Sequence, residues 1–346
     1  MTKKLLKAAG NPWGQRITLL ILICIVMAIF EPIFFKAANA KSILLAISVN
    51  GIMACGMLFT VLVGGMDLSV GSMAGLAASV AFKIAEGSGF STGSFILGCA
   101  AALAVCLLTG WLNGFFVTRF GLPAFVVTLA MKYALYGSIY MVTRGFYVYS
   151  PGNGPAFKIG NSNVLTIPMP VIIFAVCVAV CAFMLGKTTY GRRLYAIGGN
   201  VKASNLVGIN SDVNIRVTYM ISSVLAGLGG IILASMNGQA GQPTALNYEG
   251  NVLMAMIVGG INLAGGEGGV PGAVFGALLV GIINNVMLLL GVSSDTTKFF
   301  QGIIIIAAMS LNMYTQRRSA GLTGRPSAKS SAKSAPKDAG SPSGSE

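Results

Sequence analysis

Two short phrases, each a pair of glycines followed by a small acid or amide, interrupt apolar stretches of this chain. The first is Val63-Gly64-Gly65-Met66-Asp67-Leu68-Ser69, and the second is Val258-Gly259-Gly260-Ile261-Asn262-Leu263-Ala264. Glycine pairs break a helix, and a broken helix frees backbone amides and carbonyls for polar partners. Inside a bilayer such breaks survive only where protein or a water-filled cavity covers the freed backbone. Two related breaks therefore predict a path through a membrane.

The phrases begin at residues 63 and 258, a separation of 195 residues. This spacing favours a weak internal duplication, with Gly64 facing Gly259 and Gly65 facing Gly260. The alternative is that glycine-rich membrane helices simply resemble one another. We expect Asp67 to cap the helix after the first break, because an acid at a helix N-terminus satisfies free amides. A direct ligand contact is the less favoured role for it.

The composition requires these breaks to lie in membrane helices. Of 346 residues, 55% are hydrophobic and 9% are charged, and the mean hydropathy is +0.79. A soluble domain carries about 25% charged residues. The chain is therefore predicted to be an all-α polytopic membrane protein, with broken or short helices at the two Gly-Gly motifs.

A membrane span needs about 20 apolar residues. Windows of that length predict about ten transmembrane helices, at 17–35, 43–63, 70–86, 95–118, 123–143, 167–186, 217–236, 251–264, 271–291 and 298–314. The third and eighth are short and flank the breaks. An even number of spans places both termini on one side of the membrane.

The net charge of +14 reports orientation, because the basic residues gather in alternate gaps and at the ends. No basic face with interleaved aromatics points to nucleic acid. The charge pattern predicts cytoplasmic termini and three segments: a cytoplasmic N-terminus at 1–16, a transmembrane domain at 17–316 and a disordered cytoplasmic tail at 317–346. The tail has two readings, an anionic-lipid tether and, preferred, a solvated segment.

The longest predicted inner loop runs from Lys187 to Arg216. A short helix at 201–207 is expected between two glycine-rich turns, with Val201, Ala203 and Leu206 on its apolar face. Gly208 follows, and glycine commonly ends a helix. This helix suits docking to a protein; the alternative is a helix lying on lipid.

Three motifs, in order, resemble the signatures of the ribose-type sugar permeases of ABC importers. They are Gly64-Gly65-Met66-Asp67-Leu68-Ser69-Val70-Gly71, Ala196-Ile197-Gly198-Gly199-Asn200, and Val258-Gly259-Gly260 through Gly265-Gly266-Glu267-Gly268. The resemblance covers about residues 40 to 314. It implies a permease in the bacterial inner membrane that moves a monosaccharide or polyol, and a second permease copy or a paralogous permease beside it. It also implies a cytoplasmic ABC ATPase subunit and a periplasmic substrate-binding protein as partners.

The resemblance assigns two groups of site residues. Coupling to the ATPase is expected at Tyr190, Gly191, Arg192, Arg193, Gly198, Gly199, Asn200, Ala203, Leu206 and Gly208. The gate and helix breaks are expected at Gly64, Gly65, Asp67, Gly71, Gly259, Gly260, Gly265 and Gly266.

Polar residues inside the spans are candidates for the sugar path, because amides both donate and accept hydrogen bonds. The candidates are Asn50, Asn113, Lys132, Asn284 and Asn285. For each amide the favoured alternative is an interhelical hydrogen bond. Lys132 departs from the apolar residue usual in the family. It is hypothesised to favour electron-rich or anionic sugars; snorkelling or pairing with a carboxylate is the alternative.

Other function classes fit less well. The chain has no histidine and no G-x-x-x-x-G-K-[ST] loop, so no enzyme activity, metal site or cofactor is predicted. ATP and Mg would be bound by the partner ATPase. A secondary transporter would need more intramembrane carboxylates than Asp67, with Glu86 and Glu249 at the edges of spans. A membrane-embedded enzyme would need a histidine or a paired-carboxylate site, and the sequence offers neither.

Overall fold

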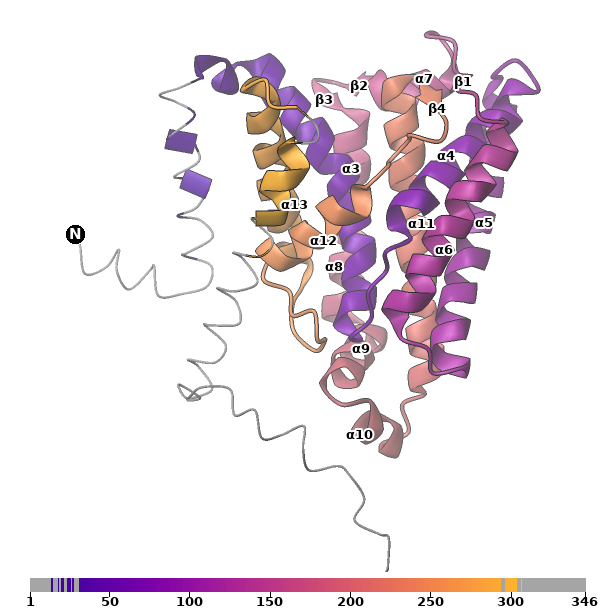
Figure 1. The fold of residues 1–346 in the computed structure, drawn as a ribbon, viewed down its shortest axis with the longest axis vertical. Coiled ribbons are helices and arrows are strands. Elements are labelled where there is room, and N and C mark those ends of the chain that lie inside the picture. The colour runs from indigo at the N-terminus through magenta and orange to yellow at the C-terminus, as the bar shows by residue number, and fades with distance from the viewer. Residues whose placement is uncertain are drawn as a thin grey trace, which may run out of the picture.

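The structure, a computed structural model, describes residues 31–293, 296–303 and 306, together with residues 14, 18, 20, 21, 24, 25 and 27. The predicted N-terminal segment and tail lie outside these residues, apart from Gly14. The described part is helical, with four very short strands (Figure 1).

The long helices are α3 (Ala37–Leu62), α4 (Val70–Glu86), α5 (Thr92–Arg119), α6 (Ala124–Thr143), α8 (Met169–Lys187), α11 (Ser211–Asn237) and α13 (Val270–Leu289). The shorter ones are η1 (Pro32–Phe35), α7 (Pro155–Asn161), α9 (Thr189–Gly199), α10 (Val201–Leu206) and α12 (Tyr248–Val258). Strand β1 (Val148–Tyr149) pairs antiparallel with β4 (Gln239–Ala240), and β2 (Asn163–Val164) pairs antiparallel with β3 (Ile167–Pro168).

Six described helices are long and apolar enough to cross a membrane: α3, α5, α6, α8, α11 and α13. The short predicted spans are α4 and α12. The predicted limits of 251–264 are wrong, because α12 ends at Val258 and the residues after it form the break. The predicted first span also ends too late, since residues 32–35 form the separate turn η1. The first and tenth spans lie largely outside the described residues, so ten remains a prediction.

The two ends of the bundle differ (Figure 1). The strands and α7 lie at one end, and α9 and α10 project from the other. Helix α3 reaches this second end, which we call the α10 end, and the chain then rises to start α4 part-way up the bundle. The polypeptide between α12 and α13 also turns at the α10 end. The chain at both Gly-Gly breaks therefore reaches the end of the bundle that carries α9 and α10.

Helix α11 lies at the centre, packed against α3, α4 and α5. Small residues allow close approach: a side chain at Gly230 would collide with the Ala74 carbonyl of α4, and one at Gly110 of α5 would meet the backbone of Tyr219. Membrane helices associate through such small-residue contacts, because lipid provides no hydrophobic driving force between them. Helix α11 is thus held firmly to the helices on either side of the first break.

Candidate functional site

Both breaks begin with the same backbone arrangement, the Schellman motif. After α3, Gly64 adopts a φ of +76°; after α12, Gly260 adopts +68°. In each case the glycine amide donates to the carbonyl three residues back, and the next amide donates to the carbonyl five residues back, at 2.9–3.0 Å. Glycine is favoured at this left-handed position because it has no Cβ to clash.

A side-chain turn follows each motif. The Asp67 carboxylate accepts from the Ser69 amide at 3.0 Å, and the Asn262 carbonyl oxygen accepts from the Ala264 amide at 3.0 Å. The predicted spacing of 195 therefore holds for the acid and the amide. The helix-ending glycines correct the predicted pairing, because Gly64 corresponds in structure to Gly260 rather than to Gly259.

The two breaks contact each other at the α10 end. The Gly266 amide donates to the Leu62 carbonyl at 2.9 Å, joining the second break to the end of α3. A Cβ on Gly64 would lie 3.2 Å from the Ala264 carbonyl oxygen, and one on Gly265 would lie 2.8 Å from the Gly64 nitrogen. The sequence predicted the two breaks but did not predict that they touch.

Helix α9 packs on this contact. A Cβ on Gly198 would collide with the Leu62 carbonyl and the Gly266 amide, the two groups of the hydrogen bond that joins the breaks. The Tyr195 hydroxyl donates to the Gly268 carbonyl at 2.9 Å, and burial raises the pKa of this phenol. We call residues 62–65, 198–199 and 264–268 the junction. It brings together all three sequence motifs that carried the family resemblance.

Three other predicted glycines, Gly259, Gly71 and Gly191, are also close-packing points. A side chain at Gly259 would collide with the Gly272 carbonyl at the start of α13. A side chain at Gly71, in the first turn of α4, would collide with the Glu249 carboxylate. Gly191 lies against the backbone of Leu185 where α8 ends.

The loop between α8 and α11 contains two helices rather than the one predicted. The glycine-rich turn expected before the 201–207 helix is instead part of α9, whose N-cap Thr188 accepts from the Gly191 amide at 3.2 Å. Asn200 then caps α10 by accepting from the Ala203 amide at 3.0 Å. Gly208, with a φ of +84°, ends α10, as expected.

The apolar side chains of the α10 region have no cover within the described residues. Leu206 is 89% exposed, Val207 is 76% exposed and Val201 is 41% exposed. Arg192 and Arg193 of α9 are also exposed nearby in the chain. A projecting apolar surface is typical of a site that contacts a protein or a membrane, so docking to a protein stays a prediction.

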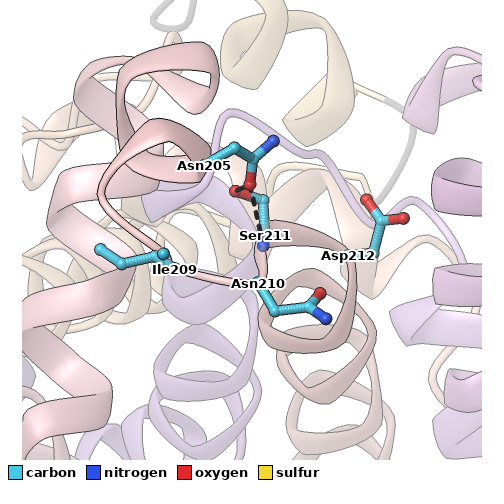
Figure 2. Close-up of a pocket in the computed structure, with 6 residues that line it drawn as sticks. Asn205, Ile209, Asn210, Ser211 and Asp212 are labelled. Atoms are coloured by element: carbon cyan, nitrogen blue, oxygen red, sulfur yellow. Dashed lines mark hydrogen bonds between the residues drawn. The ribbon is translucent and has the colours of Figure 1, made fainter.

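The α10 region is tied to the central helix. The Asn205 side chain accepts from the Ser211 hydroxyl at 2.7 Å and from its amide at 3.3 Å, as Figure 2 shows. Asn210 caps α11 by accepting from the Val213 amide at 3.1 Å. These residues, with Gly208, Ile209 and Asp212, line a shallow hollow of about 320 Å³. Movement of α10 would therefore pull directly on the start of α11.

Helix α11 in turn binds the first break. Asp67 is fully buried and accepts from the Ser69 hydroxyl at 2.6 Å and from the Ser222 hydroxyl of α11 at 2.8 Å. Asn113 of α5 donates to the Ser69 hydroxyl at 3.1 Å. Asp67 thus binds Ser69, the residue just before α4, and also connects this residue to α11 through Ser222. This role is wider than the predicted helix cap. The sequence did not indicate Ser222.

Most of the predicted path amides lie inside the bundle. Asn113 and Asn50 are buried, and Asn285 exchanges two hydrogen bonds with Asn39, at 3.0 and 2.8 Å. For Asn113 and Asn285 this geometry matches the alternative of an interhelical hydrogen bond. Asn284 differs, because it is only partly buried and accepts from Gln301 at 2.8 Å.

Lys132 has a carboxylate partner. Its ammonium lies 2.6 Å from Oε1 of Glu249, with 19% of the Lys132 side chain and 10% of the Glu249 side chain exposed. The structure corrects the placement of Glu249 at the edge of a span, since it lies buried in the first turn of α12. It also favours the alternative that Lys132 pairs with a carboxylate, because the two charged groups are in direct contact. The pair carries no net charge.

Residues 39–309 match the family described as branched-chain amino acid transport system, permease component. The chain belongs to this permease family. It is 38% identical to the ribose import permease protein of Escherichia coli strain K12 over 297 residues, covering 85% of this chain and 91% of that one.

Two further relatives come from the same strain. The permease is 34% identical to the L-arabinose transport system permease protein over 314 residues, covering 89% of this chain and 93% of that one. It is 30% identical to the xylose transport system permease protein over 348 residues, covering 83% and 87%. No solved structure matches the chain. The resemblance to ribose-type permeases is confirmed, and the chain is a multi-pass membrane permease component rather than an enzyme.

Proposed function

We propose that the chain is the transmembrane permease subunit of an ABC importer that moves a monosaccharide or related polyol into the cell. ATP and Mg would be bound and used by a partner ATPase, since the chain has no phosphate-binding loop of its own. A substrate-binding protein would deliver the sugar at the face of the membrane opposite to the ATPase. The relatives named for ribose, L-arabinose and xylose support this class of substrate.

One observation carries the proposal: the exposed surface of α10 is connected mechanically to both breaks. Asn205 and Ser211 join α10 to α11, Ser222 joins α11 to Asp67, and Gly198 of α9 packs on the junction. ATP binding would move an ATPase docked on Leu206. That displacement would reach the first break through α11 and both breaks through α9.

The charge distribution supports an orientation with the α10 end in the cytoplasm of a bacterial inner membrane. The loop 187–216 at that end carries five basic residues, Lys187, Arg192, Arg193, Lys202 and Arg216, and one acidic residue, Asp212. A basic loop is typical of the cytoplasmic side. Both termini would then be cytoplasmic, as the even number of predicted spans requires.

We further propose that two permease subunits pack together, either two copies or this chain with a paralogue. Helix α6 supports a partner, because Tyr133 and Tyr140, seven residues apart on one face, are 68% and 57% exposed. Polar groups at membrane depth usually face a bundle interior or a water-filled cavity. A second permease against α6 would enclose them.

The test is a charge placed on the docking surface. No described atom beyond the neighbouring backbone lies within 4 Å of where a Cβ on Gly199 would be. Gly199→Glu therefore fits among the described residues but would meet a docked ATPase. We expect this variant to insert normally and to lose stimulation of the partner's ATP hydrolysis. The matched control is Gly93→Glu, which adds the same charge at an equally open site at the opposite end. Normal stimulation by Gly199→Glu would reject the docking assignment.

A further inference from the structure

The first turn of α12 lies deep in the membrane. Figure 1 shows α12 about half-way between the two ends of the bundle, and the polypeptide after it descends to the α10 end before α13 begins. Helix α12 has 11 residues, about 16 Å at 1.5 Å per residue. A hydrocarbon core is about 30 Å thick. Its start, at Tyr248, therefore lies about half-way across the bilayer.

This turn presents polar backbone at an open surface. Gly250 and Asn247 are exposed, and no described atom beyond the neighbouring backbone lies within 4 Å of where a Cβ on Gly250 would be. Irregular backbone at membrane depth is tolerated only in protein or beside water, not against lipid. The surface over Gly250 must therefore face a water-filled cavity or protein.

The Lys132–Glu249 pair lies on one side of this surface. An ammonium has three N–H donors, and the contact with Glu249 Oε1 at 2.6 Å uses one of them. Oε2 of Glu249 is buried and has no hydrogen-bond partner within the described residues. The Lys132 ammonium thus keeps two N–H donors, and Glu249 keeps one acceptor oxygen. The pair carries no net charge.

Three amides lie on the other side. Gln301 donates from one nitrogen to the side-chain oxygens of Asn251, at 3.0 Å, and Asn284, at 2.8 Å. The amino groups of Asn251 and Asn284 donate to no described residue. All three side chains are only partly buried. Successive helix residues are about 100° apart, so Gly250 lies between Glu249 and Asn251 on the α12 surface.

We propose that the first turn of α12 is a sugar-contact site in the translocation path, with Gly250 as its floor. Lys132, Asn251 and Asn284 would donate hydrogen bonds to the hydroxyl oxygens of a neutral sugar, and Glu249 is a positioning residue that holds Lys132. The ligand class follows from the balanced charge, which argues against the anionic sugars hypothesised for Lys132 alone. This assignment rests on the proposed function.

Thiol labelling tests the site independently of transport. Gly250→Cys is made in the full chain, reconstituted in vesicles, and treated with a membrane-impermeant cationic methanethiosulfonate. The control is Val180→Cys on the apolar exposed face of α8, where Val180 is 51% exposed. We expect Gly250→Cys to react and Val180→Cys to stay at the wild-type background. Equal, background-level labelling of both would overturn the proposal.

Transport then tests the ligand. Uptake of ribose, L-arabinose and xylose is measured with the complete importer for Gly250→Leu, Asn251→Ala and the control Val180→Leu. For any sugar that the wild type transports, we expect uptake to fall about tenfold or more in the first two variants. Wild-type uptake by both would overturn the site. Wild-type uptake that needs no partner ATPase would instead reject the proposed function and leave the labelling result standing.

Discussion

The substitution Gly198→Ala tests whether the junction holds the two breaks together. Gly198 lies in α9, and a Cβ there would collide with both groups of the Gly266-to-Leu62 hydrogen bond. Because these atoms are backbone, no side-chain rotation can relieve the contact. The new methyl must separate α9 from the junction or break that hydrogen bond.

The cost can be estimated from its parts. Overpacking by one methyl in a tight core costs about 1–3 kcal/mol, and leaving a buried backbone group unpaired costs about 1–3 kcal/mol. Alanine is better than glycine in a helix by about 1 kcal/mol. The expected net destabilisation is therefore about 1–5 kcal/mol. In soluble domains of 150–250 residues 1 kcal/mol lowers the unfolding midpoint by about 2–4 °C, so we expect a decrease of at least about 2 °C.

The assay is thermal unfolding of the purified permease in detergent, followed by ATPase stimulation in vesicles. Gly93→Ala is the control, because no described atom beyond the neighbouring backbone lies within 4 Å of where its Cβ would be. We expect Gly198→Ala to unfold at a lower temperature than Gly93→Ala and to stimulate ATP hydrolysis less. Equal midpoints and full stimulation would refute the idea that α9 packs tightly on the breaks.

Other changes test the pair at α12, the crosslink to α11 and the docking surface. Lys132→Met should destabilise the permease by about 3–5 kcal/mol, because it leaves Glu249 buried and unpaired. Adding Glu249→Gln should restore most of that loss; a thermal midpoint as low as that of the single variant would contradict the pairing. Ser222→Ala removes a donor to Asp67 and should cost about 1.5–3 kcal/mol, read from denaturation midpoints, and no change would argue against a structural crosslink. Leu206→Asp should leave stability within about 0.5 kcal/mol, as exposed substitutions do, yet reduce ATPase stimulation; unchanged stimulation would place the docking surface elsewhere.

Apolar run length and glycine placement predicted much of the helix order. The predicted spans from the second to the ninth each overlap a described helix, from α3 to α13. Gly208 ends α10 as predicted, because a left-handed helix end has a local glycine requirement. Signals of this kind depend on neighbouring residues and can be read along the chain.

The contacts between distant segments could not be read in this way. The meeting of Leu62 with Gly266, and of Lys132 with Glu249, depends on how helices far apart in sequence pack. Glu249 was missed because a lone acid next to an apolar run resembles the edge of a span. Helix α9 was missed because its glycines suggested turns, whereas Gly191 and Gly198 are there for close packing.

The central claim is that movement of sugar through this permease requires a partner ATPase acting on α9 and α10. The most direct measurement is uptake of ribose, L-arabinose and xylose into vesicles containing the permease, with its ATPase and binding protein present or with the ATPase omitted. The account predicts accumulation of a sugar only with the ATPase and ATP, and its loss in Gly199→Glu. Accumulation of the same sugar against a gradient without the ATPase would contradict the account.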